Sequence, residues 1–365
     1  MIAGRLADAW DNKWRARLTP RALRRMALGL VIGLIGALIA EWGGVPLAWM
    51  LGPVFFCMAA SLAGLPAEVP MWMRSNFMIF IGLFLGESFD GLTWGALSQW
   101  PVSIAGAALY LPLAISAAYF YYRHIARELP MTALCSSIPG GLSAIIVISD
   151  ALGADERNVA LAQSLRIALV VCMAPFVAFV IMGYAAAEDG GLSGQKLISL
   201  PDLALLLGVS FALMVVLRRS GIPILALVCP LIAAAILRPL GLVEGVLPHW
   251  LVEIGLLVLG ASVGGRFAGV SWSRVFGFGA ITFGGTSILM AVAGVLAWCV
   301  SAITGQNLVD LLLAYAPGGV AEMSLIAFAI DADPGFVAVH HLVRIAFVMT
   351  LIPVMVAWFG SKARA

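Results

Sequence analysis

Long apolar runs alternate with short polar stretches along most of this chain. Each run holds about 17–27 residues, enough for a helix to cross the ~30 Å hydrocarbon core of a bilayer. The pattern predicts membrane helices over residues 24–40, 46–63, 73–89, 101–122, 157–183, 201–218, 222–239, 249–265, 275–302 and 336–359. Tryptophans near the ends of several runs fit the boundary between lipid and water. We therefore expect an all-α polytopic membrane protein.

The composition agrees with this reading. Hydrophobic residues make up 62% of the 365 residues and charged residues 11%, with a mean hydropathy of +1.04. So much apolar surface cannot be hidden in a water-soluble core, and no soluble globular domain fits between the runs. Residues 1–25 hold seven of the 21 Lys and Arg residues, and we expect them to form a basic amphipathic segment on the cytoplasmic side.

One stretch of the chain occurs twice. Pro139-Gly140-Gly141 returns as Pro317-Gly318-Gly319, an offset of 178 residues (317 − 139). Residues 139–175 and 317–353 align without a gap and are identical at 14 of 37 positions. An internal copy at this distance predicts two structurally equivalent halves. We divide the chain into the basic segment 1–25, repeat 1 over 26–184, a linker over 185–200 and repeat 2 over 201–365.

Two further apolar segments decide the topology. Residues 131–150 and 309–330 are each long enough to span once, yet each carries Pro-Gly-Gly near its middle. Proline removes a helical donor and glycine favours unwinding, so each segment could form two half-helices that dip in and return. If both segments span, each half has six crossings and the halves are parallel. If both return, each half has five crossings and the halves are inverted repeats, each with one re-entrant hairpin.

Positive charge favours the inverted scheme, because cytoplasmic loops carry an excess of Lys and Arg. In repeat 2 and its linker, the inverted scheme puts six Lys or Arg inside and two outside, leaving aside the arginine within the last apolar run. The parallel scheme divides the same residues four against four. A helix that crosses fully but is unwound at its middle stays the alternative.

Each copy places a stripe of polar residues on one helix face. The stripe consists of Asp155, Gln163 and Arg166 in the first copy and of Asp333, His341 and Arg344 in the second. The arginine lies about nine residues into its helix, ~14 Å from the start, near the middle of the bilayer. A charge at that depth usually faces the protein interior and has a partner.

The stripes and the broken segments together predict a binding site for a small anion. Unwound backbone, helix N-termini and guanidinium groups all favour negative charge. The predicted substrate-binding residues are Arg166, Arg344, Gly140, Gly141, Gly318, Gly319, Ser143, Gln163, His341 and Glu322, and the predicted caps or gates are Asp155, Asp333, Pro139 and Pro317. His341 and Glu322 take the places of Gln163 and Ala144, a titratable pair that a proton-coupled carrier could use.

Two structural readings stand beside this site. Each arginine could only hydrogen-bond carbonyls of its own hairpin and so lock the fold, and each aspartate could be a helix N-cap. No metal site or cofactor is expected, because the five cysteines and four histidines are scattered. A nucleophile–base pair is missing as well, so we do not expect an enzyme.

The paired P-G-G…A-D…V-A…R-I-A blocks resemble the duplicated membrane proteins of the Gram-negative AbrB family, over nearly the whole chain from about residue 25. The resemblance implies a bacterial inner-membrane protein, labelled a regulator of gene expression or an ammonia monooxygenase. The residues support neither label: no exposed basic module reads DNA, and no ligand cluster serves an oxygenase. The two-hairpin layout is also similar to that of glutamate and citrate carriers, a likeness of fold alone.

Two functions are therefore expected. The first is a secondary transporter for a small, anionic solute that works by alternating access between the repeats. The alternative is a membrane-embedded regulator of gene expression that acts through a partner, without transport. The expected partners are membrane lipid and a small-molecule or ion substrate, with no direct contact to nucleic acid, and a homo-oligomer stays open. Both termini are expected in the cytoplasm.

Overall fold

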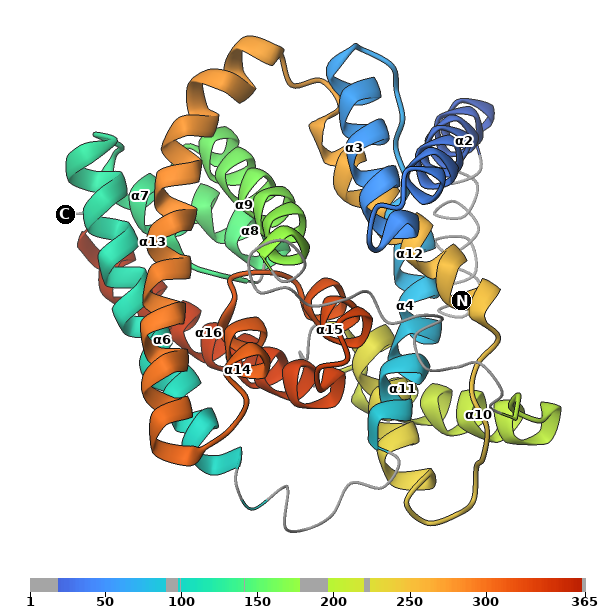
Figure 1. Ribbon diagram of the computed structural model, residues 1–365. Coiled ribbons are helices and arrows are strands. Elements are labelled where there is room, and N and C mark those ends of the chain that lie inside the picture. Colours follow the sequence, from blue (N-terminus) through green and yellow to red (C-terminus); the bar gives the residue numbers. More distant parts are fainter. Residues whose placement is uncertain are drawn as a thin grey trace, which may run out of the picture. The chain divides into compact units, whose positions relative to one another are not determined.

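The computed structural model describes residues 19–89, 98, 100–140, 142–177, 196–219 and 224–362, without the side chains of 142–144, 147, 151 and 352–362. These residues are mostly helical (Figure 1). The β-pairing found among them is one isolated parallel bridge between Leu197 and Val246. The all-α architecture predicted from the apolar runs is confirmed.

Every apolar run predicted as a membrane helix contains a helix. The elements are α2 (Pro20–Trp42), α3 (Ala48–Leu62), α4 (Met71–Gly86), η1 (Glu87–Phe89), α6 (Trp100–Phe120), η2 (Tyr121–Ile125), α7 (Pro130–Ser137), α8 (Leu142–Ala151), α9 (Glu156–Phe176), α10 (Leu200–Leu217), α11 (Leu225–Leu237), α12 (His249–Gly264), η5 (Gly265–Phe267), α13 (Trp272–Thr304), α14 (Leu308–Tyr315), α15 (Val320–Ala329) and α16 (Pro334–Lys362). The segments 131–150 and 309–330 are each broken into two short helices, α7 with α8 and α14 with α15.

Seven of the described helical stretches are long and apolar enough to cross a membrane. They are Pro20–Trp42, Trp100–Ile125, Glu156–Phe176, Leu200–Leu217, His249–Phe267, Trp272–Thr304 and Pro334–Leu351. The protein therefore has the character of a multi-pass membrane protein. Helices α3 and α11 are shorter than predicted, with 15 and 13 residues. Each follows a residue in the left-handed region, Leu47 (φ 52°) or Ile224 (φ 60°), through which a right-handed helix cannot continue.

The internal duplication is visible in the boundaries of the helices as well as in the amino-acid sequence. Adding 178 to the first residue numbers of α4, α7, α8 and α9 (71, 130, 142 and 156) gives those of α12, α14, α15 and α16 (249, 308, 320 and 334). The short 3₁₀ turns η1 and η5, which begin at 87 and 265, obey the same offset. The two copies of the sequence thus form the same series of elements.

The chain forms two compact units. The first unit comprises Met1–Arg74 and Leu256–Ser271, and the second comprises Ser75–Gly255 and Trp272–Ala365. Helices α2 and α3 are the main pair of the first unit, and a Cβ added at Gly52 would collide with the backbone of Gly36. In the second unit α6 packs on α13, while α14 and α15 both lie against α16 (Figure 1).

Glycines let the helices of the two halves approach backbone to backbone. In the second unit, a Cβ at Gly82 of α4 would meet the carbonyl oxygen of Leu227 in α11. In the first unit, a Cβ at Gly260 of α12 would meet the carbonyl oxygen of Met50 in α3. Gly82 and Gly260 are 178 residues apart. The two contacts are therefore the same contact with the halves exchanged.

Candidate functional site

Each Pro-Gly-Gly triplet lies where a helix stops and a second one begins. Helix α7 ends at Ser137 and α14 at Tyr315, because the proline two residues later has no N–H to donate to a helical hydrogen bond. Gly140 has a φ of 106°, a conformation that only glycine adopts readily. Gly141 and the side chain of Ser143 lie outside the described residues.

Arg166 of α9 reaches the first break. Its side chain is buried, and Nη1 donates to the carbonyl oxygen of Ile138 at 2.9 Å while Nη2 donates to Gln163 Oε1 at 2.6 Å. Gln163 in turn donates from Nε2 to the carbonyl oxygens of Cys135 at 2.9 Å and Ile138 at 3.1 Å. The guanidinium group and the amide therefore share the unpaired carbonyls at the end of α7, groups that a helix C-terminus leaves without partners.

Arg344 of α16 reaches the second break in the same way. Nη1 donates to the carbonyl oxygen of Ala316, and Nη2 donates to that of Gly318 at 2.6 Å. His341 Nε2 lies 2.9 Å from the carbonyl oxygen of Leu313. Both side chains are buried. Each buried arginine thus has polar partners, which are backbone carbonyls of the broken segment and, for Arg166, also the side chain of Gln163.

The contacts of the two copies correspond position by position. With the offset of 178, Arg166 to Ile138 becomes Arg344 to Ala316, and Gln163 to Cys135 becomes His341 to Leu313. An imidazole thus replaces an amide as the donor to the same carbonyl. The two copies therefore share the positions of the side chain and of the carbonyl group that it contacts, although the type of side chain differs.

The two aspartates of the stripes are helix N-caps. Asp155 Oδ1 accepts from the backbone N–H groups of Arg157 and Asn158, and Asp333 Oδ1 accepts from that of Phe336. The backbone N–H of Asp155 donates to Thr132 Oγ1 at 2.9 Å. The equivalent N–H of Asp333 donates to Asp310 Oδ1, also at 2.9 Å. Both side chains therefore act as caps, and neither aspartate forms an ion pair with the arginine of its stripe among the described contacts.

Glu322 places a buried carboxylate beside the second break. It is the third residue of α15 and is buried, and a Cβ added at Gly319 would collide with its carboxylate. A carboxylate at this position interacts favourably with the positive end of the helix dipole. The start of α15, predicted as open to an external anion, thus already lies beside a carboxylate of the chain itself.

A second layer of polar side chains was not predicted. Tyr315 donates from its hydroxyl to the carbonyl oxygen of Ser103 at 2.6 Å, and His340 Nε2 lies 2.9 Å from Ser103 Oγ. Tyr110 of α6 is fully buried, stacks with Tyr315 and lies within electrostatic range of both Arg166 and Arg344. The two guanidinium groups also lie within electrostatic range of each other. The second unit therefore collects both arginines around one buried tyrosine.

Several polar atoms in this region are buried and lack a hydrogen-bond partner among the described residues. They are Arg166 Nε, Arg344 Nε, Tyr110 Oη, His341 Nδ1, Ser136 Oγ and Ser324 Oγ. Each such atom costs about 1–3 kcal/mol, so natural proteins seldom leave several of them close together without a purpose. These atoms come from both breaks and from α6, α9 and α16.

The fold and this buried site define a duplicated, polytopic helical protein with paired helix breaks held by buried arginines. The family profile described as "Transition state regulatory protein AbrB" matches residues 3–94 and 49–360, so the chain belongs to the AbrB family. The uncharacterized protein YhjN of Bacillus subtilis strain 168 is 27% identical over 361 residues, 89% of this chain and 90% of that protein. A protein of Escherichia coli K12, named as a proposed regulator AbrB, is 24% identical over 328 residues, 87% of this chain and 92% of that protein.

Proposed function

We propose that the chain is a secondary transporter for a small anionic solute, working by alternating access between two inverted repeats in the bacterial inner membrane. The observation that carries the proposal is the gathering of Arg166, Arg344 and Tyr110 between two breaks of helical structure, with polar atoms that find no partner within the described part of the chain. Buried charge and interrupted helices at the middle of a bundle are where transporters bind their substrates.

The hydrogen bond between Thr132 and Asp155 supports a re-entrant hairpin. If α7 and α8 continued in line, their 18 residues would extend ~27 Å. The few residues between Ala151 and Asp155 reach at most about 14 Å, too little to bring the chain back to the start of α7. Yet the backbone N–H of Asp155 lies 2.9 Å from Thr132 Oγ1, in the first turn of α7. This contact supports the proposal that the chain enters and leaves the membrane on the same side.

The same argument applies to α14 and α15, because Asp310 and Asp333 repeat the bond. With both broken segments returning, each half has five crossings. In repeat 1 these are α2, α3, α4, α6 and α9, and in repeat 2 they are α10, α11, α12, α13 and α16. An odd number of crossings inverts the second half relative to the first. Both termini then lie in the cytoplasm, in line with the distribution of Lys and Arg.

The arginine fork fits an anionic solute. Each guanidinium carries five N–H donors. Two nitrogens of Arg344 donate to its break, and those of Arg166 donate to its break and to Gln163. The Nε groups of both arginines have no partner among the described residues, which leaves directed donors for carboxylate oxygens. Solute binding and the shape of the break are then coupled, since one side chain touches both.

The first test measures solute uptake by the purified protein in proteoliposomes, with radiolabelled succinate, glutamate and citrate as probes. Arg166→Ala and Arg344→Ala should each reduce uptake of the transported probe at least tenfold, because each removes a charge-assisted hydrogen bond. Arg274→Gln removes an exposed charge of α13 and should leave uptake unchanged. Elution as a single species and a similar melting temperature would separate loss of function from loss of fold. Undiminished uptake in both alanine variants would refute the proposal.

A second candidate is a membrane-embedded regulator that acts through a partner, without transport. The name of the relative from Escherichia coli and the description of the family favour it. It predicts that wild-type proteoliposomes take up none of the probes. It also predicts that a transcriptional reporter responds to changes in residues 1–25 and in the Arg218-Arg219 turn, and does not respond to Arg166→Ala.

A further inference from the structure

Arg166 and Arg344 carry buried charges whose contacts are with neutral groups. The two residues are 3% and 2% exposed. Within the described part of the chain, their Nη groups donate to backbone carbonyls of the breaks and to the side-chain amide of Gln163. Glu322, the buried carboxylate at the second break, is not among these partners. A buried charge is costly without an opposite charge beside it, so a ligand that supplies negative charge would stabilise this pair.

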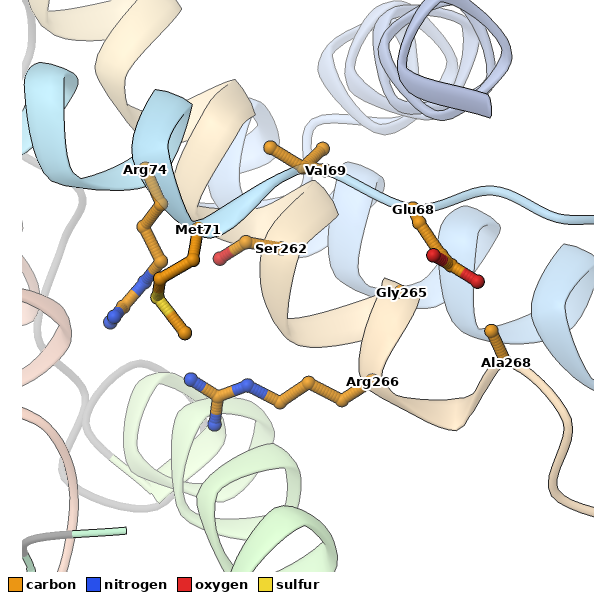
Figure 2. A pocket seen from close by; sticks show the side chains of 8 residues that line it. All are labelled: Glu68, Val69, Met71, Arg74, Ser262, Gly265, Arg266 and Ala268. Carbon is orange, nitrogen blue, oxygen red and sulfur yellow. The ribbon is translucent and has the colours of Figure 1, made fainter. Parts of the chain in front are cut away.

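Two arginines of the first unit lie beside a cavity and differ from this pair. Figure 2 shows Arg74 and Arg266 at that cavity, which has a volume of about 250 Å³. Both are half-buried, and both take part in further interactions within the chain. Their charges therefore give no reason to expect a ligand, whereas Arg166 and Arg344 are buried against neutral groups.

The charges of Arg166 and Arg344 also act on each other. Both guanidinium groups lie within electrostatic range of Tyr110, and Arg166 acts on Arg344 over the same kind of distance. Helix α15, which follows the second break, lies against α9, which carries Arg166. Since like charges repel, gathering the two in an apolar interior adds to the cost of burying each one. An anion that contacts both groups at once reduces both costs.

The internal repeat places the two arginines at equivalent positions of the two copies. The offset of 178 carries Arg166 onto Arg344, and it carries Ile138 onto Ala316, the residues whose carbonyl oxygens they contact. The Nε of each arginine lacks a hydrogen-bond partner among the described residues. In the proposed inverted arrangement an approximate twofold axis relates the copies. A ligand with the same group at both ends can then make the same contact twice.

We propose that the solute is a linear dicarboxylate, with one carboxylate on Arg166 and the other on Arg344. This inference rests on the proposed transport function and names the substrate class of that site. A planar guanidinium binds a carboxylate through parallel hydrogen bonds, and two carboxylates match two buried charges. A monocarboxylate leaves one of the charges without a counterpart. Tyr110 lies within electrostatic range of both arginines, and its hydroxyl can contact the part of the ligand between the carboxylates.

The test measures binding to the detergent-purified, full-length protein by isothermal titration calorimetry. The ligands are malonate, succinate, glutarate and adipate, each compared with its monomethyl ester, which keeps the carbon chain but carries one charge. At least one dicarboxylate should bind the wild type about tenfold or more tightly than its ester, because the ester gives up one charge-assisted contact. In Arg166→Gln and in Arg344→Gln this ratio should fall toward one, since a single guanidinium remains.

Three controls accompany the arginine variants. Arg274→Gln removes an exposed charge of α13 and should keep the ratio of the wild type. Arg166→Lys and Arg344→Lys keep the positive charge, so they should retain a preference for the dicarboxylate even if a glutamine variant does not fold. Continued binding of the ester by a glutamine variant shows that this variant is folded.

The proposal is overturned if every ester binds the wild type as tightly as its dicarboxylate, or if both glutamine variants keep the full preference. Tighter binding of sulfate than of any dicarboxylate would also overturn it, because one compact dianion would then serve both arginines. If the esters bind equally well and their uptake still depends on Arg166 and Arg344, the solute is a monoanion and the transport function stands. If no compound of either charge binds or is taken up, the transport function fails as well.

Discussion

At the scale of single residues, the two copies keep the same hydrogen bonds while changing the side chains that make them. Thr132 and Asp310 accept the same backbone N–H bond, one as a hydroxyl and the other as a carboxylate. Gln163 is likewise replaced by His341. The second copy therefore has a carboxylate and an imidazole at two positions where the first has a hydroxyl and an amide.

Asp333 gives a prediction on pH. Burial raises the pKa of its carboxyl above the usual value, although the backbone N–H groups of Phe336 and Gly335 partly oppose this. A raised pKa in the folded state means that the contribution to stability is complete below the unfolded pKa of ~3.9 and is lost as pH rises through the folded value. Asn at this position still caps α16 but stays neutral.

The melting temperature of the wild type should therefore fall relative to that of Asp333→Asn as the pH is raised from about 4 to about 8. Asp155→Asn makes the same change at the exposed cap of α9 and serves as the matched control. Parallel pH curves for the wild type and Asp333→Asn would contradict the argument.

The sequence predicts the buried arginines and their depth, because a charge within an apolar run needs a partner inside the protein. It also offers the carbonyls of the break as partners, and the structure agrees. It misses Tyr110 and Ser103, since a lone tyrosine or serine in an apolar helix looks like ordinary packing. Their role depends on α6 lying against α14 and α16, which no local pattern reveals.

At the scale of elements, the glycine contacts of α4 with α11 and of α12 with α3 should be equally sensitive to substitution. Gly82→Val and Gly260→Val both insert atoms against a neighbouring carbonyl group, and each should destabilise the protein by about 1–3 kcal/mol. Gly208→Val places the same side chain in open space on α10 and is the control. Thermal melting in detergent measures the effect. A large loss in one variant with none in the other would show that the two contacts are not equivalent.

The apolar runs predict which helices exist, and the Pro-Gly-Gly triplets predict where two of them break. The sequence does not predict where α3 and α11 start. Each helix follows a residue with a left-handed backbone conformation, and the hydropathy of the chain does not indicate such a conformation. The pairing of α3 with α12 is missed for a similar reason. A repeat in the sequence tells which elements correspond, but not which of them touch.

At the scale of the whole molecule, the inverted arrangement predicts which loops face the outside. Cysteines placed at Lys196 and Ile303, both exposed, should react with a membrane-impermeant maleimide added to intact cells. The background is a variant with the five native cysteines replaced, and Arg219→Cys is the cytoplasmic control. The parallel arrangement puts both positions in the cytoplasm, so protection of both from the reagent would rule out inverted repeats.

The exchanged glycine contacts also bear on how the protein is made. Helix α3 leaves the ribosome some 200 residues before α12, the helix whose Gly260 it receives. Until then the face of α3 at Met50 and Pro53 lacks the helix that packs on it, and the same holds for Gly82 of α4 until α11 emerges. These two contacts can therefore form only after the second half of the chain has been made.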